Sequence, residues 1–142
     1  MPFVCCLVVV IAAVWGGIWL YNTLQQPRLS RTLLPGPPGG PQPGQIWQAK
    51  VPFEDGSGVK KRPCVVLGFT GEWYLVLTIT SKDKGGRFDT VRIPTLHWDP
   101  TALHDSYLKV TPALGIFGAD FLYHRGLVDP STWAYVCRRH RF

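Results

Sequence analysis

The sequence predicts a mainly β domain, a small and strongly curved barrel with a C-terminal helix, behind one transmembrane helix and a Pro/Gly-rich linker. Three observations lead to this prediction. The chain has 142 residues, enough for about one domain. No charged side chain precedes Arg28. From Gln45 onward, short segments rich in β-branched and aromatic residues alternate with turn-forming residues, a pattern typical of small barrels.

The composition excludes several classes of protein. Hydrophobic residues make up 46% of the chain and charged residues 17%, which is not the composition of a disordered protein. The short domain excludes a large multidomain enzyme and a nucleotide-binding sheet of the usual size. The four cysteines show neither a metal spacing nor the pattern of a disulfide-stapled miniprotein. Cys64 and Cys137 are expected to be reduced, buried thiols, and a disulfide between them is the alternative.

The first element is a predicted transmembrane helix over residues 3–21, which hold no charge and match the thickness of a bilayer core. Trp15, Trp19 and Tyr21 lie toward its C-terminal end, where aromatic rings favour the membrane interface. A cleaved signal peptide is the alternative interpretation. No cation precedes the apolar run and no small-x-small cleavage site follows it, so a retained anchor is favoured.

The flanking charges predict the orientation of this anchor. Arg28 and Arg31 follow the apolar segment, and the N-terminal side has only the α-amino group. Positive charge favours the cytoplasmic side, so the globular domain is expected in the cytoplasm, with an external domain as the alternative. The next element, residues 22–44, is interpreted as a passive linker because its prolines and glycines do not build a packed core.

The globular domain is predicted over residues 45–142. Strands are expected at 46–51 and 63–68, joined by a long polar loop over 54–61. Residues 73–79 (WYLVLTI) are β-branched and aromatic enough to form a central strand buried on both faces.

Two further strands and one helix complete the prediction. The strands are expected at 88–93, after a solvated loop, and at 106–110. Asp129 and Pro130 have the residue types of a helix N-cap and of the first helical position. A terminal helix is therefore predicted over 131–139, with Trp133, Val136 and Cys137 on its apolar side.

Four segments, in this order and spacing, resemble the MazF/PemK family of toxins from type II toxin–antitoxin modules. They are Pro43-Gly44-Gln45-Ile46-Trp47, Lys60-Lys61-Arg62-Pro63-Cys64-Val65-Val66-Leu67, Ile79-Thr80-Ser81-Lys82 and Gly126-Leu127-Val128-Asp129-Pro130. The resemblance implies an SH3-like barrel of the MazF/PemK/CcdB type, a homodimer, and an antitoxin partner whose acidic segment covers a basic rim. It also implies an endoribonuclease that cuts single-stranded RNA without metal or cofactor, by attack of the 2′-hydroxyl. With the anchor, this places the protein in the bacterial cell membrane.

The catalytic residues that the resemblance implies are Arg62 and Thr80. Internal phosphoryl transfer loads negative charge onto the non-bridging phosphate oxygens, and a guanidinium can answer that charge with two parallel hydrogen bonds. Pro63 favours an extended backbone at Arg62. Thr80 ends the most apolar predicted strand, where its hydroxyl can reach a phosphate oxygen. The alternative interpretations are a solvated arginine and an ordinary strand threonine.

Further residues of these segments are candidates for RNA binding. The loops beside Arg62 and Thr80 carry cations and one additional hydroxyl, at Lys60, Lys61, Ser81, Lys82, Lys84 and Arg87. Converging there, they would form a basic rim for an RNA backbone. Trp47 and Phe53 are candidates for stacking unpaired bases, and Trp47 is equally compatible with a place in the core.

A general base for the 2′-hydroxyl is not assigned by the sequence. Glu54, Asp55 and His97 are candidates by residue type alone. The family often has carboxylates where this chain has Ala49 and Val51, and a polar pair in the later strand, which here reads Leu108-Lys109-Val110-Thr111. These departures favour an alternative function, a weakened or inactive nuclease that binds nucleic acid or protein, including a gyrase-directed binder. The segment His97-Trp98-Asp99 is interpreted as a turn and not as a metal site.

Overall fold

The structure is a computed structural model that describes residues 33–53, 55–82 and 88–140, which belong to one compact unit. The predicted transmembrane helix (3–21), the first half of the predicted linker, and Glu54, Lys84 and Arg87 lie outside the described residues. Within the described ranges, no helix is both long and apolar enough to cross a bilayer.

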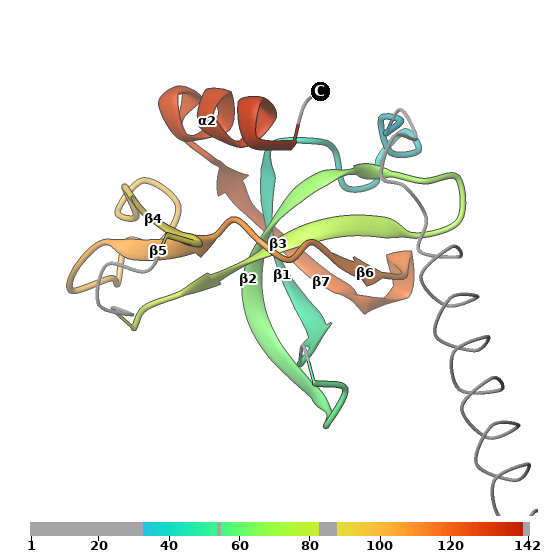
Figure 1. Cartoon of the computed structure of the whole chain (residues 1–142), viewed down its shortest axis with the longest axis horizontal. Helices are drawn as coiled ribbons and strands as arrows, with labels where there is room; N and C mark the ends of the chain where they lie inside the picture. Colours follow the sequence, from blue (N-terminus) through green and yellow to red (C-terminus); the bar gives the residue numbers. More distant parts are fainter. Residues whose placement is uncertain (1–32, 54, 83–87, 141–142) are drawn as a thin grey trace, which may run out of the picture. The chain divides into compact units, whose positions relative to one another are not determined.

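The described chain forms a mainly β fold with one C-terminal helix (Figure 1). Its elements are β1 (Gln45–Pro52), β2 (Val59–Phe69), β3 (Tyr74–Thr80), β4 (Thr90–Ile93), β5 (Ser106–Lys109), β6 (Leu114–Ile116), a short 3-10 helix (Gly118–Asp120), β7 (Phe121–Leu127) and α2 (Pro130–His140). The strands are antiparallel, in the order β4-β5-β3-β2-β1-β7, and β6 pairs with β3 beside β5.

The sheet divides where β2 and β3 separate. Their ladder runs from the Phe69–Tyr74 pair to the Cys64–Thr78 pair and ends there. Pro63 follows in β2 and has no N–H to donate to a ladder. Beyond this point β2 stays paired with β1 in a hairpin that projects from the domain, and β3 pairs with β5 (Figure 1). The fold is therefore open between β2 and β3 at this end.

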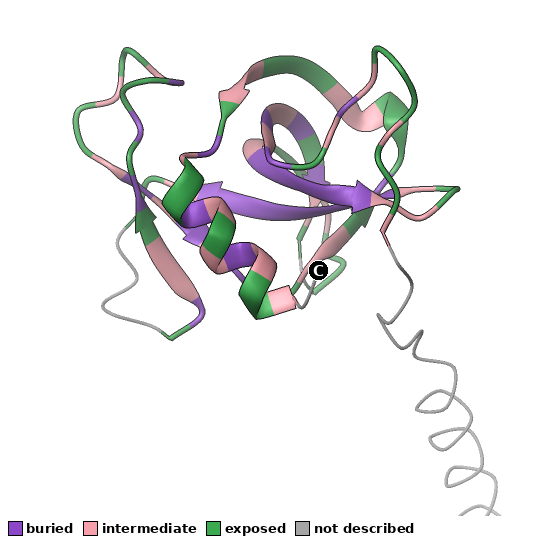
Figure 2. Ribbon diagram, turned by 90° about the horizontal axis from the view of Figure 1, so that it is seen from above, coloured by how far each residue is buried: buried purple, intermediate pink, exposed green. Residues whose placement is uncertain are grey.

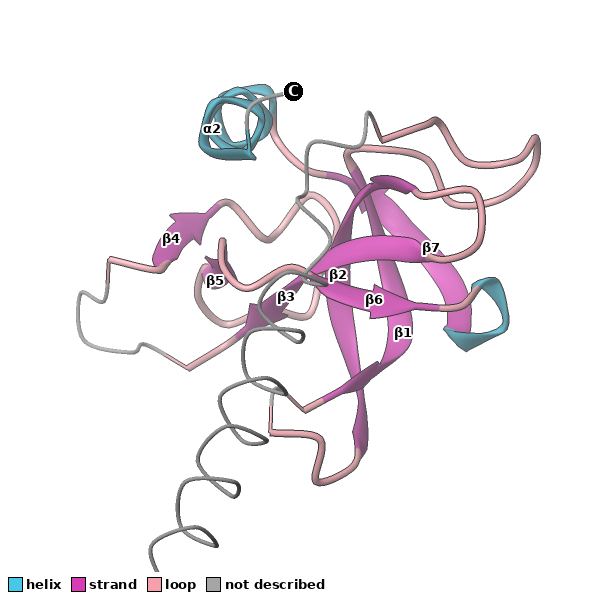
Figure 3. Ribbon diagram, turned by 45° about the vertical axis from the view of Figure 1, so that its right-hand side comes forward, coloured by secondary structure: helices cyan, strands magenta, loops and turns pink. Residues whose placement is uncertain are grey.

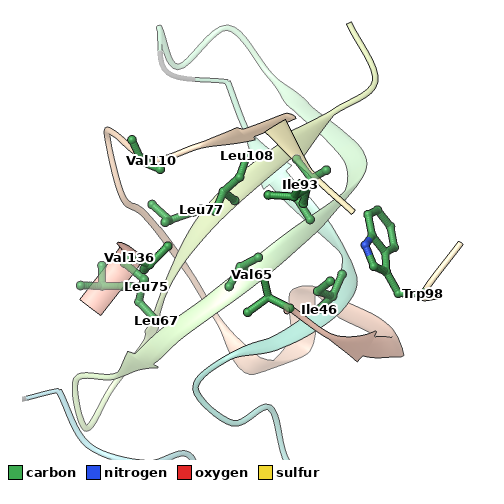
Figure 4. Packing of buried hydrophobic residues seen from close by; sticks show 12 residues of the cluster. Ile46, Val65, Leu67, Leu75, Leu77, Ile93, Trp98, Leu108, Val110 and Val136 are labelled. Carbon is green, nitrogen blue, oxygen red and sulfur yellow. The ribbon is translucent and has the colours of Figure 1, made fainter. Parts of the chain in front are cut away.

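Alternation along the strands gives the sheet two different faces. One face carries the larger core cluster, in which Val65, Leu75 and Leu77 pack with Leu108 of β5 and Val136 of α2 (Figure 4). The other face carries a smaller cluster that includes Ala49, Cys64, Val66 and Val76. Fully burying one such aliphatic side chain stabilises the fold by about 1.5–3 kcal/mol. The buried residues follow the central strands in Figure 2.

The terminal helix begins as the sequence predicts. Asp129 Oδ2 accepts hydrogen bonds from the Thr132 amide at 3.0 Å and from Ser131 Oγ at 2.6 Å, and Pro130 is the first helical residue. Burial raises the pKa of Asp129, but these hydrogen bonds outweigh it and hold the pKa below its ordinary value. Val136 is buried, and Trp133 packs against the larger cluster at its edge.

The two cysteines of the described residues are free. Cys64 is fully buried, and burial raises the pKa of its thiol to about 12, so it stays protonated at neutral pH. Cys137 is only half-buried. The expectation of burial is confirmed for Cys64 and not for Cys137, and the reduced state of both thiols stays a prediction.

Several predicted boundaries differ from the structure. The prediction of a loop over 54–61 is wrong at its C-terminal boundary, because β2 already begins at Val59. Lys60 and Lys61 pair with Val51 and Lys50 of β1, so cross-strand hydrogen bonds extend the hairpin through residues that look like a loop. β4 begins at Thr90 and not at residue 88.

Two strands were not expected from the sequence. β6 has three residues, too few to show alternation. β7 is an edge strand that pairs only with β1 among the described strands, and all of its residues are exposed or half-buried. An edge strand of this kind has no alternating apolar pattern to predict it.

The described part of the predicted linker, residues 33–44, packs on the domain. Leu34 and Phe69 exchange two backbone hydrogen bonds of 2.9 Å, and the Gly44 amide donates to the Val66 carbonyl at 2.9 Å. A Cβ atom at Gly68 would lie 2.7 Å from Cβ of Leu33, so this close approach requires glycine. Residues 33–44 are thus part of the folded unit.

Candidate functional site

Arg62 lies on β2 where β2 and β3 part. It is paired with Ala49 of β1, and directly opposed residues of neighbouring strands share a face of the sheet. Arg62 is therefore on the same face as Cys64 and Val66 of the smaller cluster. Those two side chains are enclosed, whereas Arg62 is half-buried at the open end of the row.

A hollow of about 340 Å³ adjoins Arg62. Its lining residues come from the end of the β1–β2 hairpin, from β3 at the opening between β2 and β3, and from β6. Figure 3 shows how these strands are arranged. The residues that line it are Pro52, Phe53, Asp55, Arg62, Thr78 and Leu114. One wall is thus apolar, and the remainder combines a cation, a carboxylate and a hydroxyl.

An aromatic ring holds the guanidinium of Arg62. Its central carbon lies 5.4 Å from the centroid of the Phe53 ring, the distance of a cation–π contact. Its Nε is buried and has no hydrogen-bond partner among the described residues. A buried donor left unpaired costs about 1–3 kcal/mol, and because this atom is closed to solvent, an acceptor in the hollow pairs with it only if the guanidinium shifts.

The other arginines of the sheet are used differently. Arg125 pairs with Asp99 at 3.3 Å, donates to Gln48 Oε1 at 3.1 Å and lies 5.1 Å from the centroid of the Trp98 ring. Arg92 pairs with Asp105 at 3.2 Å. Arg62 has no such carboxylate partner among the described residues.

Two threonines of β3 share the face of Arg62. Thr78 is the partner of Cys64, and Thr80 lies two residues further along the same strand. Thr78 lines the hollow and is nearly buried, whereas Thr80 is half-buried and does not line it. The Lys82 amide donates to Thr80 Oγ1 at 3.2 Å, and this bond leaves the Thr80 hydroxyl proton for another acceptor.

Thr78 was not among the residues proposed from the sequence. The sequence feature that could have identified Thr78 is its position two residues before Thr80, because residues two apart in a strand lie on the same face. The apolar run WYLVLTI concealed it as a core residue.

Of the two candidate general bases that the structure describes, Asp55 lies at the hollow and His97 does not. Asp55 lines the hollow, but hydrogen bonds from Ser57 hold the pKa of its carboxyl below the ordinary value, which makes it a weak base. One of them, from the Ser57 amide to Oδ1, is 2.9 Å long. His97 lies in the turn after β4, where its Nε2 is 2.9 Å from the Leu127 carbonyl oxygen, and it does not line the hollow.

The proposed RNA-binding cations do not all converge. Lys60 alternates with Lys61 along β2, so Lys60 shares the face of Arg62 and Lys61 shares the opposite face with Lys50. Lys82 is exposed just beyond β3. Ser81 lines a second hollow together with Arg92, His104, Asp105 and Tyr107.

The two aromatic candidates have different surroundings. Trp47 packs edge-on against Phe121 and His124, with ring centroids 5.7 and 5.4 Å away, and its Nε1 donates to Gln45 Oε1 at 2.9 Å. These contacts give Trp47 a packing role. The Phe53 ring is 39% exposed and lies against Arg62, so it contributes to the hollow directly.

No family model matches this chain, and no curated protein matches it. Within the described ranges, no cluster of three or more His, Cys, Asp or Glu side chains is arranged to hold a metal ion. What the hollow can bind is therefore judged from its own side chains. A guanidinium on an aromatic ring, with a nearby lysine and two hydroxyls on the same face, suits a singly charged phosphodiester.

Proposed function

We propose that this protein is a membrane-tethered endoribonuclease of the MazF/PemK type, with an SH3-like barrel, that cleaves single-stranded RNA at the hollow around Arg62. The observation that carries the proposal is the guanidinium of Arg62. It is oriented by Phe53, has a buried and unpartnered Nε, and faces an open hollow that has a threonine hydroxyl in its wall. The ordered sequence segments that resemble this family support it independently.

The reaction uses the substrate's own nucleophile. The 2′-oxygen attacks the adjacent phosphorus, the bond from phosphorus to the 5′-oxygen breaks, and a 2′,3′-cyclic phosphate and a 5′-hydroxyl form. Arg62 stabilises the charge that grows on the non-bridging oxygens, and Thr80 or Thr78 donates to one of them. The proton of the 2′-hydroxyl passes to water, since no general base is assigned among the described residues, and a second water returns a proton to the 5′-oxygen.

The proposal also includes the partners that such a toxin requires. A second copy of the chain forms a homodimer, and an antitoxin with an acidic flexible segment covers the cationic hollow. The N-terminal anchor places the domain on the cytoplasmic side of the membrane, where its RNA substrate is present.

A cleavage assay tests this function. Full-length protein in detergent is mixed with single-stranded RNA in the presence of a chelator, and the product ends are identified. We expect cleavage with 2′,3′-cyclic phosphate ends, and its loss in Arg62→Ala but not in Arg139→Ala, which removes an exposed arginine of α2. Equal activity of wild type and Arg62→Ala, or products without cyclic phosphate, would refute it.

A second candidate function is RNA binding without cleavage. The observation that favours it is Asp55, the one carboxylate described in the lining of the hollow, which is a weak base. Salt-dependent RNA binding with no cut products would identify this function. Inhibition of a topoisomerase without RNA breakage would instead identify a gyrase-directed binder.

A further inference from the structure

A second hollow, of about 270 Å³, adjoins the β4–β5 side of the same sheet. It is bounded by the end of β3, by β4 and β5, and by the residues just before β5. Its lining residues are Ser81, Arg92, His104, Asp105 and Tyr107. The ribonuclease proposal uses Ser81 only as part of a general rim, so this hollow has no role in it.

The pairing of the strands places both hollows on one face. Thr80 of β3 is the partner of Tyr107 of β5, and Tyr107 is the partner of Arg92 of β4. Directly opposed residues share a face, so Tyr107 and Arg92 lie on the face of Thr80 and hence of Arg62. The residues that alternate with them, Ile79 and Leu108, belong to the core cluster on the opposite face.

The two hollows are separated by one strand. In the sheet order, β3 lies between β2, which carries Arg62, and β5, which carries Tyr107. The β2–β3 ladder ends at the Cys64–Thr78 pair, and β5 pairs with β3 just beyond it, at Ile79 and Thr80. Thr78, which lines the first hollow, and Thr80, the partner of Tyr107, are therefore two residues or about 7 Å apart along the strand. A chain of a few nucleotides can span this distance. Thr80 lies between the two hollows and can contact the backbone of that chain.

The chemistry of the second hollow differs from that of the first. Arg92 Nε donates to Asp105 Oδ2 at 3.2 Å, and His104 Nδ1 lies 2.9 Å from the Asp105 carbonyl oxygen. The carboxylate offsets the arginine charge, which makes this a poor second phosphate site. The Tyr107 ring, together with a guanidinium, an imidazole and a carboxylate, offers a flat apolar surface edged by hydrogen-bond donors and acceptors. An unpaired nucleobase has the complementary chemistry.

We propose that the second hollow is a nucleobase subsite for the RNA chain whose phosphodiester is held at Arg62. Tyr107 stacks on the base, and the Arg92–Asp105 pair contacts its polar edge. This inference rests on the proposed function, because it takes RNA as the ligand of the first hollow. It adds a site that selects among RNA sequences by reading one base beside the scissile bond.

The test compares two kinds of single-stranded octamer that have equal charge. The first kind carries bases and consists of four homopolymers, one for each base. The second kind is abasic. All of them have 2′-fluoro groups in place of the 2′-hydroxyl, so the protein cannot cleave them by internal attack. Dissociation constants are measured for full-length wild type, Tyr107→Ala, Tyr107→Phe and Arg62→Ala in detergent, and thermal unfolding verifies that each variant is folded.

We expect wild type to bind at least one base-bearing octamer more tightly than the abasic one. Tyr107→Ala should weaken binding of that octamer about tenfold, in the range for loss of one stacked base, and change abasic binding less than about twofold. Tyr107→Phe should retain the wild-type preference, because it retains the ring. Arg62→Ala should weaken binding of both probes.

The failure of the subsite and that of the proposed function are distinguishable. If Tyr107→Ala changes both probes equally or neither, while Arg62→Ala weakens both, the subsite is refuted and phosphodiester binding at Arg62 is retained. If Arg62→Ala leaves both unchanged, the first hollow does not hold RNA, and the shared path across the sheet is refuted with it.

Discussion

At the scale of single residues, the Arg62 guanidinium packs on an aromatic ring, and no carboxylate of the described residues is paired with it. Pro63 fixes the backbone direction after it, and the Phe53 ring lies 5.4 Å from its guanidinium carbon. A carboxylate partner would neutralise the charge that an incoming phosphate needs. An aromatic ring orients the guanidinium and leaves its net charge unchanged.

The role of Phe53 can be tested with a pair of substitutions. Phe53→Leu keeps an apolar side chain but removes the ring, and an exposed cation–π contact contributes about 0.5–1 kcal/mol. We expect RNA affinity to fall by roughly twofold to fivefold in Phe53→Leu. Phe53→Tyr keeps the ring and is expected to bind as wild type does. Equal binding by both variants in a titration at fixed salt would contradict this role.

Asp55 is expected to oppose RNA binding and not to assist catalysis. Its pKa lies below the ordinary value of 3.8, so it is ionised throughout the neutral range and faces the same hollow as Arg62. Asp55→Asn should therefore bind RNA more tightly and leave the pH profile of cleavage between pH 5 and 8 unchanged. The matched control is Glu72→Gln, an exposed acid at the opposite end of β2, which should have a smaller effect. A loss of cleavage in Asp55→Asn would identify Asp55 as the base.

The structure places Arg62 beside a hollow, and its catalytic role stays a prediction. Arg62 is identifiable in the sequence only through the segments that resemble the MazF/PemK family. Thr78 is not, because a threonine within a β-branched run has the pattern of a core residue, and only the separation of β2 from β3 exposes it to a hollow. Lys61 was grouped with Lys60 and Arg62 by sequence proximity, whereas the period of two in β2 places it on the other face.

At the scale of elements, the strands that are buried were the predictable ones. β1, β3 and the core half of β2 have continuous or alternating apolar patterns, and the helix has a complete start signal. β6 and β7 lack such patterns because one is three residues long and the other is an edge. Their positions are determined by pairing with β3 and β1, which are distant in the sequence. Both hollows depend on such pairing, so neither could be located from the sequence.

The helix cap gives a prediction about stability. Asp129→Ala removes the acceptor for the Thr132 amide and should lower the free energy of unfolding by about 1 kcal/mol at pH 7. The pKa of Asp129 is lower in the folded state, so its carboxylate stabilises the fold above the ordinary value of 3.8 and loses this effect as the pH falls through the folded pKa.

Denaturant titrations at several pH values measure this effect. Asp129→Asn keeps a side-chain acceptor without a titrating charge, so its stability relative to wild type should improve as the pH is lowered below 3.8. A constant difference between these two proteins at all pH values would contradict the contribution of the ionised cap.

At the scale of the whole molecule, net charge bears on how strongly the domain attracts RNA. All 9 acids of the chain and 13 of its 15 lysines and arginines occur from Gln45 onward, so the domain is only mildly basic. Its general charge is thus a weak source of RNA affinity, and a local arrangement such as that at Arg62 has to supply most of it.

The anchor gives a prediction for the intact protein. Because residues 3–21 are apolar and uncharged, the full chain should sediment with membranes and resist extraction at high pH. A chain without residues 2–31 should remain in the soluble fraction. Release of the full chain by high pH would show that the segment does not span the bilayer.

The central claim is that Arg62 and a threonine hydroxyl of β3 hold the same phosphodiester. A double-mutant cycle on kcat/KM for RNA cleavage, with Arg62→Ala, Thr80→Val and the double variant of the full chain, tests it most directly, and Thr78→Val is measured in the same way. Groups that share one phosphate should be coupled. For at least one of the two threonines, the loss of transition-state stabilisation in the double variant should differ from the sum of the losses in the two single variants by about 1 kcal/mol. Losses that add to within about 0.3 kcal/mol for both threonines would show that they act apart from Arg62 and would contradict the account.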